Sequence, residues 1–244
     1  MYVLWSLCIL YSVENLLNKI LRKLTKLRLQ PIRVFCFHQV SDSFDSASMW
    51  SCDWISSKDL KYLINMIQAD GYTFISLQEA HCHISNDIFR FRKYAVLTAD
   101  DGSKTLDNII PWLRQKKIPL TIFINGRYLD GITYREAPSE KYLTQDEVFA
   151  LADATIEIGN HGWDHRDLRC LSTQDFEQSI SRNVNLLSIH PRYISFWAYP
   201  YGTHSRQSDE ILLRQGLIPV LMNGRQNYNN SHVINRELID KYGK

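Results

Sequence analysis

The architecture is most visible in the stretch YAVLTADDG, residues Tyr94–Gly102, where an apolar run ends in two acidic residues and a glycine. The run is short and contains β-branched and aromatic residues, which is typical of a buried strand. The glycine permits a sharp turn directly after the acids. Parallel α/β proteins place their chemistry at the carboxyl ends of such strands, so we expect a functional site here.

Similar apolar runs lie on both sides of this stretch, and helical patterns separate most of them. This alternation predicts a mostly parallel sheet with helices outside, either open and doubly wound or closed into a barrel. We expect a single-domain, distorted (β/α)7 barrel over residues 31–244. The other strands are expected near Arg33 (RVFCF), Thr73 (TFIS), Leu120 (LTIFI), Thr155 (TIEIG), Ile194 (ISFWA) and Ile218 (IPVLM), with VINRELI as the last strand. The helices are expected over Ser57 to Asp70, Lys104 to Lys116, Thr144 to Ala152, Ser172 to Ile189 and Ser208 to Gln215, the third of them opening on a capping-box pattern.

The first 30 residues differ from the rest of the chain. Met1 to Val13 is apolar and almost uncharged, and Glu14 to Arg28 has the pattern of an amphipathic helix with a basic face. The apolar run is too short for an ordinary membrane span and lacks the features of a cleavable signal peptide. We expect residues 1–30 either to contact an anionic membrane peripherally or to pack on the barrel. The expected location is therefore the cytoplasm or the membrane periphery.

Composition excludes several classes of protein. The 28 lysines and arginines nearly balance 26 aspartates and glutamates, giving a net charge of +2, which argues against a nucleic-acid binder. The five cysteines are odd in number and none has CxxC spacing. A disulfide framework or a structural zinc cluster is therefore not expected, and a reducing compartment fits better.

Two strand ends carry residues suited to binding a metal ion. Asp100 and Asp101 are adjacent, so their side chains point in different directions, and one can face a metal while the other contacts a bound water. After TIEIG, His161 and His165 lie four residues apart, which in a helical turn puts both rings on one side. Two imidazoles and one carboxylate form a three-ligand set that leaves positions open for water and substrate.

Two other strand ends offer further polar or aromatic groups. After ISFWA, the turn Tyr199–Gly202 (YPYG) is rigid, with backbone N–H groups that can bind an oxyanion and ring faces that suit a sugar. At the end of RVFCF, His38 is expected to share the same rim. Each segment alone has an ordinary structural explanation, but together they favour an active site.

Taken together, TADDG, GNHGWDH and WAYPYG resemble, in this order and at these separations, the first three motifs of the polysaccharide deacetylases. The resemblance runs from about Val34 to the end of the sequence. The early FHQV segment is similar to one in the bacterial poly-N-acetylglucosamine deacetylases. The resemblance implies a hydrolase of the cell envelope that removes N-acetyl groups from N-acetylglucosamine-type residues of a glycan or lipid-linked saccharide and releases acetate.

The resemblance also implies a role for each matching residue. Asp101, His161 and His165 would bind a divalent metal, zinc first, with cobalt, nickel or manganese as alternatives. Asp100 would be the general base, His38 the general acid, and the backbone N–H of Tyr201 part of an oxyanion hole. The residues expected to contact substrate are Asn160, Trp163, Trp197, Tyr199, Pro200 and Tyr201.

Three alternatives remain open at this point. The same ligand set would serve a metal-dependent esterase that removes O-acetyl groups from carbohydrate. A non-catalytic carbohydrate-binding relative would keep the motifs for shape, although a binder has no need of both Asp100 and Asp101. A third alternative is a scaffold that associates with membranes through Met1 to Arg28.

Overall fold

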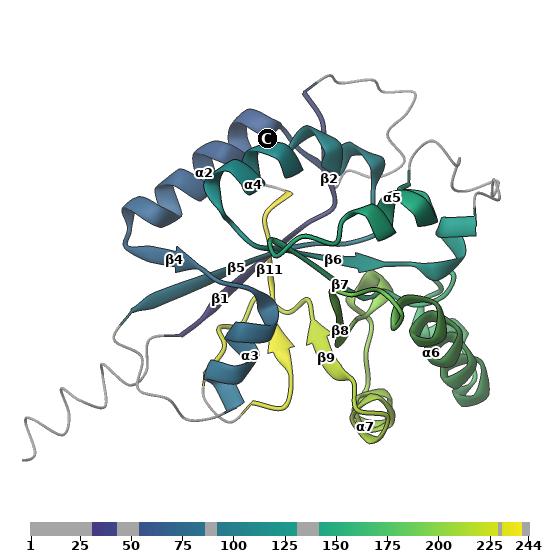
Figure 1. Ribbon diagram of the computed structural model, residues 1–244. Coiled ribbons are helices and arrows are strands. Elements are labelled where there is room, and N and C mark those ends of the chain that lie inside the picture. The colour runs from purple at the N-terminus through teal and green to yellow at the C-terminus, as the bar shows by residue number, and fades with distance from the viewer. Residues whose placement is uncertain (1–30, 43–53, 86–91, 131–141, 229–230, 241–244) are drawn as a thin grey trace, which may run out of the picture.

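The computed structural model describes residues 31–42, 54–85, 92–130, 142–228 and 231–240 (Figure 1). The predicted N-terminal amphipathic helix falls on residues 1–30, outside this part of the chain. Within the described ranges, no helix is both long and apolar enough to cross a membrane.

The main sheet has nine strands, and all of its ladders are parallel. Along the sheet the order is β10-β9-β8-β7-β6-β5-β1-β11, and β4 pairs with the first half of β5. The strands are β1 (Arg33–Phe37), β4 (Tyr72–Phe74), β5 (Lys93–Ala99), β6 (Leu120–Ile124), β7 (Ile156–Asn160), β8 (Tyr193–Ala198), β9 (Ile218–Leu221), β10 (Ile234–Asn235) and β11 (Glu237–Leu238).

One short segment brings the two edges of this sheet together. β10 pairs with β9 at one end of the order, and β11 pairs with β1 at the other, yet only Arg236 separates them in the chain. The sheet is therefore a nearly closed barrel, which confirms the predicted distorted (β/α) barrel and the assignment of VINRELI as its last strand. We call residues 234–238 the closing segment.

The helices follow the predicted pattern, with one addition. They are α2 (Ser57–Ala69), α3 (Leu77–Ser85), α4 (Ile110–Lys116), α5 (Gln145–Ala150), α6 (Thr173–Leu187) and α7 (Arg206–Arg214). The predicted capping box is present at Thr144 with Glu147, and the predicted helix start at Ser172 also forms one, with Asp175. α7 begins two residues earlier than predicted because Ser205 is its N-cap. The sequence analysis did not predict α3 or the two-stranded sheet of β2 (Gln39–Val40) and β3 (Trp54–Ile55).

Side-chain alternation along the strands divides the core into an inner and an outer part. Phe35 and Leu97 face outward and pack in one cluster with Leu60 of α2. Val34 and Val96 face the other way and pack with Leu77, Ala80 and Ile84 of α3. α3 therefore fills the amino-terminal end of the barrel and leaves the carboxyl end for the site.

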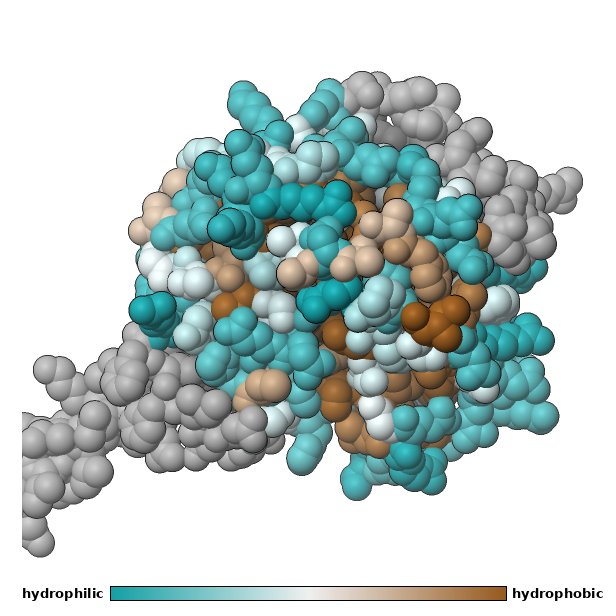
Figure 2. All heavy atoms as spheres, viewed as in Figure 1, coloured by the Kyte–Doolittle hydropathy of each residue, from teal (hydrophilic) through white to brown (hydrophobic). Residues whose placement is uncertain are grey.

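The surface around α3 is mostly polar. Figure 2 shows polar residues over most of the face seen in Figure 1, with apolar residues in the space between α3 and α7.

Candidate metal centre and active site

Asp100 and Asp101 follow β5 and turn to different sides, as predicted. Asp100 is 2% exposed, and its backbone N–H donates to the Phe37 carbonyl of the neighbouring strand β1 (3.0 Å). Asp101 has φ 70° and Gly102 φ 69°, so the chain reverses here in left-handed conformations. A Cβ on Gly102 would lie 2.6 Å from Ile124 Cδ1, which only glycine avoids. The turn fixes Asp101 at the mouth of the barrel.

His161 and His165 follow β7, but they do not lie on a helical turn, which corrects the prediction. The segment is a loop in which Gly162 (φ 86°) and His165 (φ 54°) are left-handed. The loop nevertheless brings the two rings together, with centroids 5.1 Å apart. His161 Nδ1 lies 3.0 Å from the Ala198 carbonyl, a contact that orients the ring with Nε2 toward Asp101.

One carboxylate oxygen of Asp101 lies close to the imidazoles of both His161 and His165. Its Oδ1 lies 3.3 Å from His161 Nε2 and 3.2 Å from His165 Nε2. Zinc bonds of about 2.1 Å separate two tetrahedral ligands by about 3.4 Å, so these distances fit a shared cation. Among the described residues, this trio is the group of carboxylate, imidazole or thiolate ligands close enough to hold a metal ion. Two nitrogens and one oxygen suit zinc or a neighbouring divalent ion.

Asn125 extends this cluster at the end of β6. Its side chain is fully buried, and its Nδ2 donates to Asp101 Oδ1 (3.3 Å). Burial alone raises the pKa of Asp101, but the hydrogen bond from His161 and the nearby histidine charges outweigh that effect and lower it. Asp101 is therefore ionised and held with its oxygen toward the imidazoles.

Asp100 forms a buried ion pair with an arginine that the sequence analysis missed. Arg236 of the closing segment donates to Asp100 Oδ1 (2.6 Å) and Oδ2 (2.8 Å), and the guanidinium lies 5.1 Å from the centroid of the Phe123 ring. Burial raises the pKa of Asp100, but the charge of Arg236, more than any other group, lowers it to about 2. The carboxylate is thus ionised, and its Oδ2 lies 3.9 Å from His161 Nε2, beside the candidate metal position.

His38 is paired with a second residue that the sequence analysis missed. Its Nδ1 lies 2.6 Å from Oδ2 of the fully buried Asp240, and its backbone N–H donates to the other carboxylate oxygen (3.2 Å). Burial lowers the pKa of His38, but the hydrogen bond to Asp240 and the charges of Asp100 and Asp101 raise it to about 9. His38 is therefore protonated at neutral pH.

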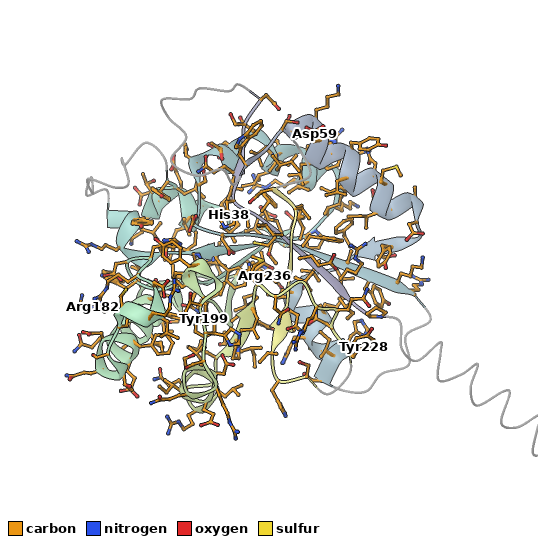
Figure 3. The ribbon with its side chains drawn as sticks, turned by 180° about the vertical axis from the view of Figure 1, so that it is seen from behind. His38, Asp59, Arg182, Tyr199, Tyr228 and Arg236 are labelled. Atoms are coloured by element: carbon orange, nitrogen blue, oxygen red, sulfur yellow. The ribbon has the colours of Figure 1, made fainter. Side chains whose placement is uncertain are left out.

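These side chains line one cavity at the carboxyl end of the barrel, with a volume of about 340 Å³. Figure 3 shows His38 and Arg236 near the centre of this end and Tyr199 to one side, with Asp59 and Tyr228 at the periphery. The remaining walls include the apolar side chains of Met222 and Leu238. The full lining is His38, Asp100, Asp101, His161, His165, Tyr199, Tyr201, Gly202, Met222, Arg236 and Leu238.

Tyr201 lies beside the candidate metal ligands, as the YPYG turn suggested. Its backbone is left-handed (φ 58°), and its ring centroid lies 4.7 Å from that of His165. The ring is 68% exposed, so it faces solvent at the cavity mouth. Tyr199 also lines the cavity, but its hydroxyl donates to Asp209 of α7 (2.8 Å).

Four of the six residues predicted to contact substrate do not line this cavity. Trp197 is 1% exposed and packs edge-on against Phe176 of α6. Asn160 is fully buried and donates to the Phe196 carbonyl (3.0 Å), and Pro200 is buried as well. Trp163 also lies outside the cavity lining, half-buried beside Arg182. Strand alternation turns Trp197 outward, because Ala198 and Phe196 occupy the inward positions.

The fold and the site together define a barrel enzyme whose polar residues gather at the carboxyl ends of parallel strands. The chain belongs to the polysaccharide deacetylase family, whose family model matches residues 90–220. This confirms the resemblance stated from the motifs and supports a hydrolase.

Known proteins of similar sequence and structure agree with this assignment. The protein YxkH of Bacillus subtilis (strain 168), whose name describes a polysaccharide deacetylase, is 20% identical to this chain over 156 residues. The alignment covers 63% of this chain. The aligned region spans about half of that protein (53%). IcaB from Ammonifex degensii has a TM-score of 0.73 at 22% identity, with 86% of this chain and 92% of that chain covered. The BpsB deacetylase domain from Bordetella bronchiseptica has a TM-score of 0.66 at 18% identity, covering 86% and 96%. At these identities the structures show a shared fold.

Proposed function

We propose that this protein is a metal-dependent hydrolase that removes N-acetyl groups from N-acetylglucosamine-type residues of a glycan and releases acetate. One observation carries the proposal: a three-ligand metal set, an ionised aspartate and a protonated histidine converge on a single cavity. Asp101, His161 and His165 would hold the metal, zinc first, with cobalt, nickel or manganese as alternatives. When bound, such an ion polarises a carbonyl group and lowers the pKa of a water.

Asp100 is placed to act as the general base. Its carboxylate is ionised, and it lies beside the candidate metal position, where it can take a proton from an attacking water. Both of its oxygens also accept from Arg236, which fixes the orientation of the carboxylate. The backbone N–H of Tyr201 would donate to the oxyanion that develops on the acetyl carbonyl.

His38 is placed to act as the general acid. Hydrolysis of an amide requires a proton on the departing nitrogen, and His38 carries one at neutral pH. Its Nδ1 is occupied by Asp240, so Nε2 is the atom that gives up the proton. This arrangement favours an amide over an O-acetyl ester, although it does not require one.

The decisive experiment measures acetate released from N-acetylated and O-acetylated saccharides by the purified full chain. We expect release from the N-acetyl substrate, its loss after chelation, and its recovery with added zinc or cobalt. Asp100→Asn should reduce the rate by about 10²- to 10⁴-fold while the variant still binds metal. Preferential release from the O-acetyl substrate would instead establish the esterase, and sugar binding without release would establish a non-catalytic relative.

The natural substrate is proposed at the level of an N-acetylated glycan, with a lipid-linked saccharide as the alternative. Peripheral membrane contact through residues 1–30, with the catalytic domain on the cytoplasmic side or at the membrane periphery, stays a proposal. Removing residues 1–30 and measuring both vesicle binding and acetate release would separate the two properties.

A further inference from the structure

Tyr128 and Tyr142 form an aromatic pair on the rim of the barrel, outside the cavity. Their ring centroids are 4.4 Å apart with a tilt of 33° between the planes. Tyr128 lies in the short helix η2 (Gly126–Asp130) that follows β6. Tyr142 forms a bridge with Ser103, and the next residue, Leu143, donates its N–H to the Gly102 carbonyl (2.9 Å). The backbone of both tyrosines is thus tied to the strand ends that carry the site.

The pair lies next to the strand ends that carry the candidate metal ligands. β6 lies between β5 and β7 in the sheet, and these two neighbours are followed by Asp101 and His161. Tyr128 donates its N–H to the carbonyl of Asn125, whose side chain donates to Asp101. Neither tyrosine is part of the cavity lining.

Both hydroxyls lie within the electrostatic influence of the site. Burial raises the pKa of each tyrosine, and the negative charge of Asp101 and the nearby Tyr201 raise it further. The two phenols are therefore neutral at physiological pH and able to donate hydrogen bonds. Both side chains are half-buried, and neither belongs to a hydrophobic cluster of the described core, so core packing does not account for the pair.

We propose that Tyr128 and Tyr142 form a second sugar subsite, which holds the residue next to the one being deacetylated in a glycan chain. The inference rests on the proposed function. It assumes that the acetylated residue lies over the candidate metal ligands Asp101, His161 and His165, and that its acetamide enters the cavity. Aromatic faces and neutral hydroxyls match the C–H faces and hydroxyls of a sugar ring. Tyr201, exposed beside His165, would contact the acetylated residue itself.

The test compares N-acetylglucosamine with a short N-acetylglucosamine oligomer, using Tyr128→Ala and Tyr142→Ala. Loss of a contact worth about 1.4 kcal/mol changes affinity tenfold. We therefore expect KM for the oligomer to rise about tenfold in each variant, with kcat within about twofold of the parent and KM for the single sugar unchanged. Tyr128→Phe and Tyr142→Phe separate the contribution of the hydroxyl from that of the ring.

Tyr62→Ala is the matched control, because Tyr62 is 65% exposed on α2, away from the site, and should leave every parameter unchanged. An unchanged KM for the oligomer in both alanine variants would overturn the subsite, as would a fall in kcat on both substrates alike.

Calorimetric titration of each protein with the deacetylated oligomer measures the affinity of the subsite without turnover. If the parent protein released no acetate, the proposed function would fail. Weaker oligomer binding by Tyr142→Ala would still support the subsite, and equal binding would reject it.

Discussion

Asp100 and Asp101 are chain neighbours with different environments, and their environments separate their proposed roles. Asp101 faces two imidazoles and the amide of Asn125, whereas both oxygens of Asp100 accept from Arg236. The guanidinium occupies lone pairs of Asp100 that would otherwise compete for the cation. The two adjacent acids are thus suited to different roles, Asp101 as the proposed metal ligand and Asp100 as the proposed base.

At the residue scale, the sequence predicted which titratable residues would share one rim, whereas four of the six predicted substrate contacts lie outside the cavity. The predicted ligands, base and acid all lie at strand ends, and the structure brings them to one cavity. Trp197 was predicted as a sugar contact from its residue type, yet it lies within β8 on the outward face. Arg236 and Asp240 were missed because their function depends on pairing with residues more than a hundred positions away. The available signal was Arg236 itself, a charged residue inside a strand that was predicted to be buried.

The Asp240–His38 pair predicts the alkaline limit of activity. Since protonated His38 is the proposed acid, the rate should fall as pH rises through its pKa of about 9. Asp240→Asn removes the group that raises this pKa, so the fall should move to lower pH by about one unit or more. The pH dependence of kcat/KM for acetate release measures it, and an unmoved alkaline limit would contradict the assignment of His38.

The same pair contributes to stability in a defined pH window. Because the folded pKa of His38 is raised above its ordinary value of 6.5, this stabilisation is complete below 6.5 and is lost as pH rises through about 9. The stability of Asp240→Asn should therefore approach that of the parent at high pH.

Asn125 predicts a change in metal affinity that does not depend on turnover. Its hydrogen bond to Asp101 Oδ1 orients the ligand, and loss of such a supporting contact typically weakens metal binding about 10- to 100-fold. Asn125→Ala should show this loss when zinc is titrated against a competing chelator. Asn108→Ala is the control, because Asn108 donates to the Val40 carbonyl rather than to a ligand. Equal zinc affinities for Asn125→Ala and the parent would show that Asn125 does not support metal binding.

At the scale of elements, the sequence predicted helices best where a capping pattern opened them. Thr144 and Ser172 were identified as caps because serine or threonine with an acid three residues later satisfies two backbone N–H groups at once. α3 was not predicted, because it follows β4 within three residues, although Ser76 and Glu79 carry an N-cap pattern and the Glu79 N–H donates to Ser76 Oγ (3.2 Å). The His161–His165 segment was predicted as a helical turn from its spacing, but Gly162 and His165 adopt left-handed conformations that end regular structure. The ligands are therefore held by a loop fixed through Ala198 and Ile124.

The N-cap of α6 predicts a stability change without a change in chemistry. Ser172 accepts from the Asp175 N–H, and replacing such a cap by alanine typically costs about 1 kcal/mol. Ser172→Ala should lower the urea midpoint while leaving kcat unchanged at a temperature where both proteins are folded. Ser188→Ala, at the other end of the helix, should have the smaller effect. Equal midpoints for Ser172→Ala and the parent would show that the capping bonds contribute nothing.

For the whole molecule, the segment that closes the barrel also supplies the counter-charge of the proposed general base. Arg236 lies between the two strands of the closing segment and is also the counter-charge of Asp100. Both side chains are at most 2% exposed, so the pair is shielded from water. The (β/α) repeat could be predicted from alternating strand and helix patterns. The last strand could be predicted as well, but its Arg236–Asp100 ion pair could not, because it joins residues 136 positions apart.

Arg236→Met should therefore impair both properties. It leaves Asp100 buried without a partner, which typically costs about 3–5 kcal/mol. Adding Asp100→Asn removes the uncompensated charge and should recover most of the lost stability, but not the turnover. Urea unfolding of the parent, both single variants and the double variant measures the coupling. Additive losses would contradict a direct interaction.

The closing segment also has a consequence for the order in which the molecule assembles. His38 and Asp240 are 202 positions apart, and β1 joins β11 across a similar separation. Contacts between such distant segments form late, since the intervening loop must first be closed. During synthesis from the amino terminus, the ligands at β5 and β7 emerge before the arginine and aspartate that set the charges of the base and the acid. A nascent chain would thus acquire its cation ligands early but stay catalytically silent until its last strands dock.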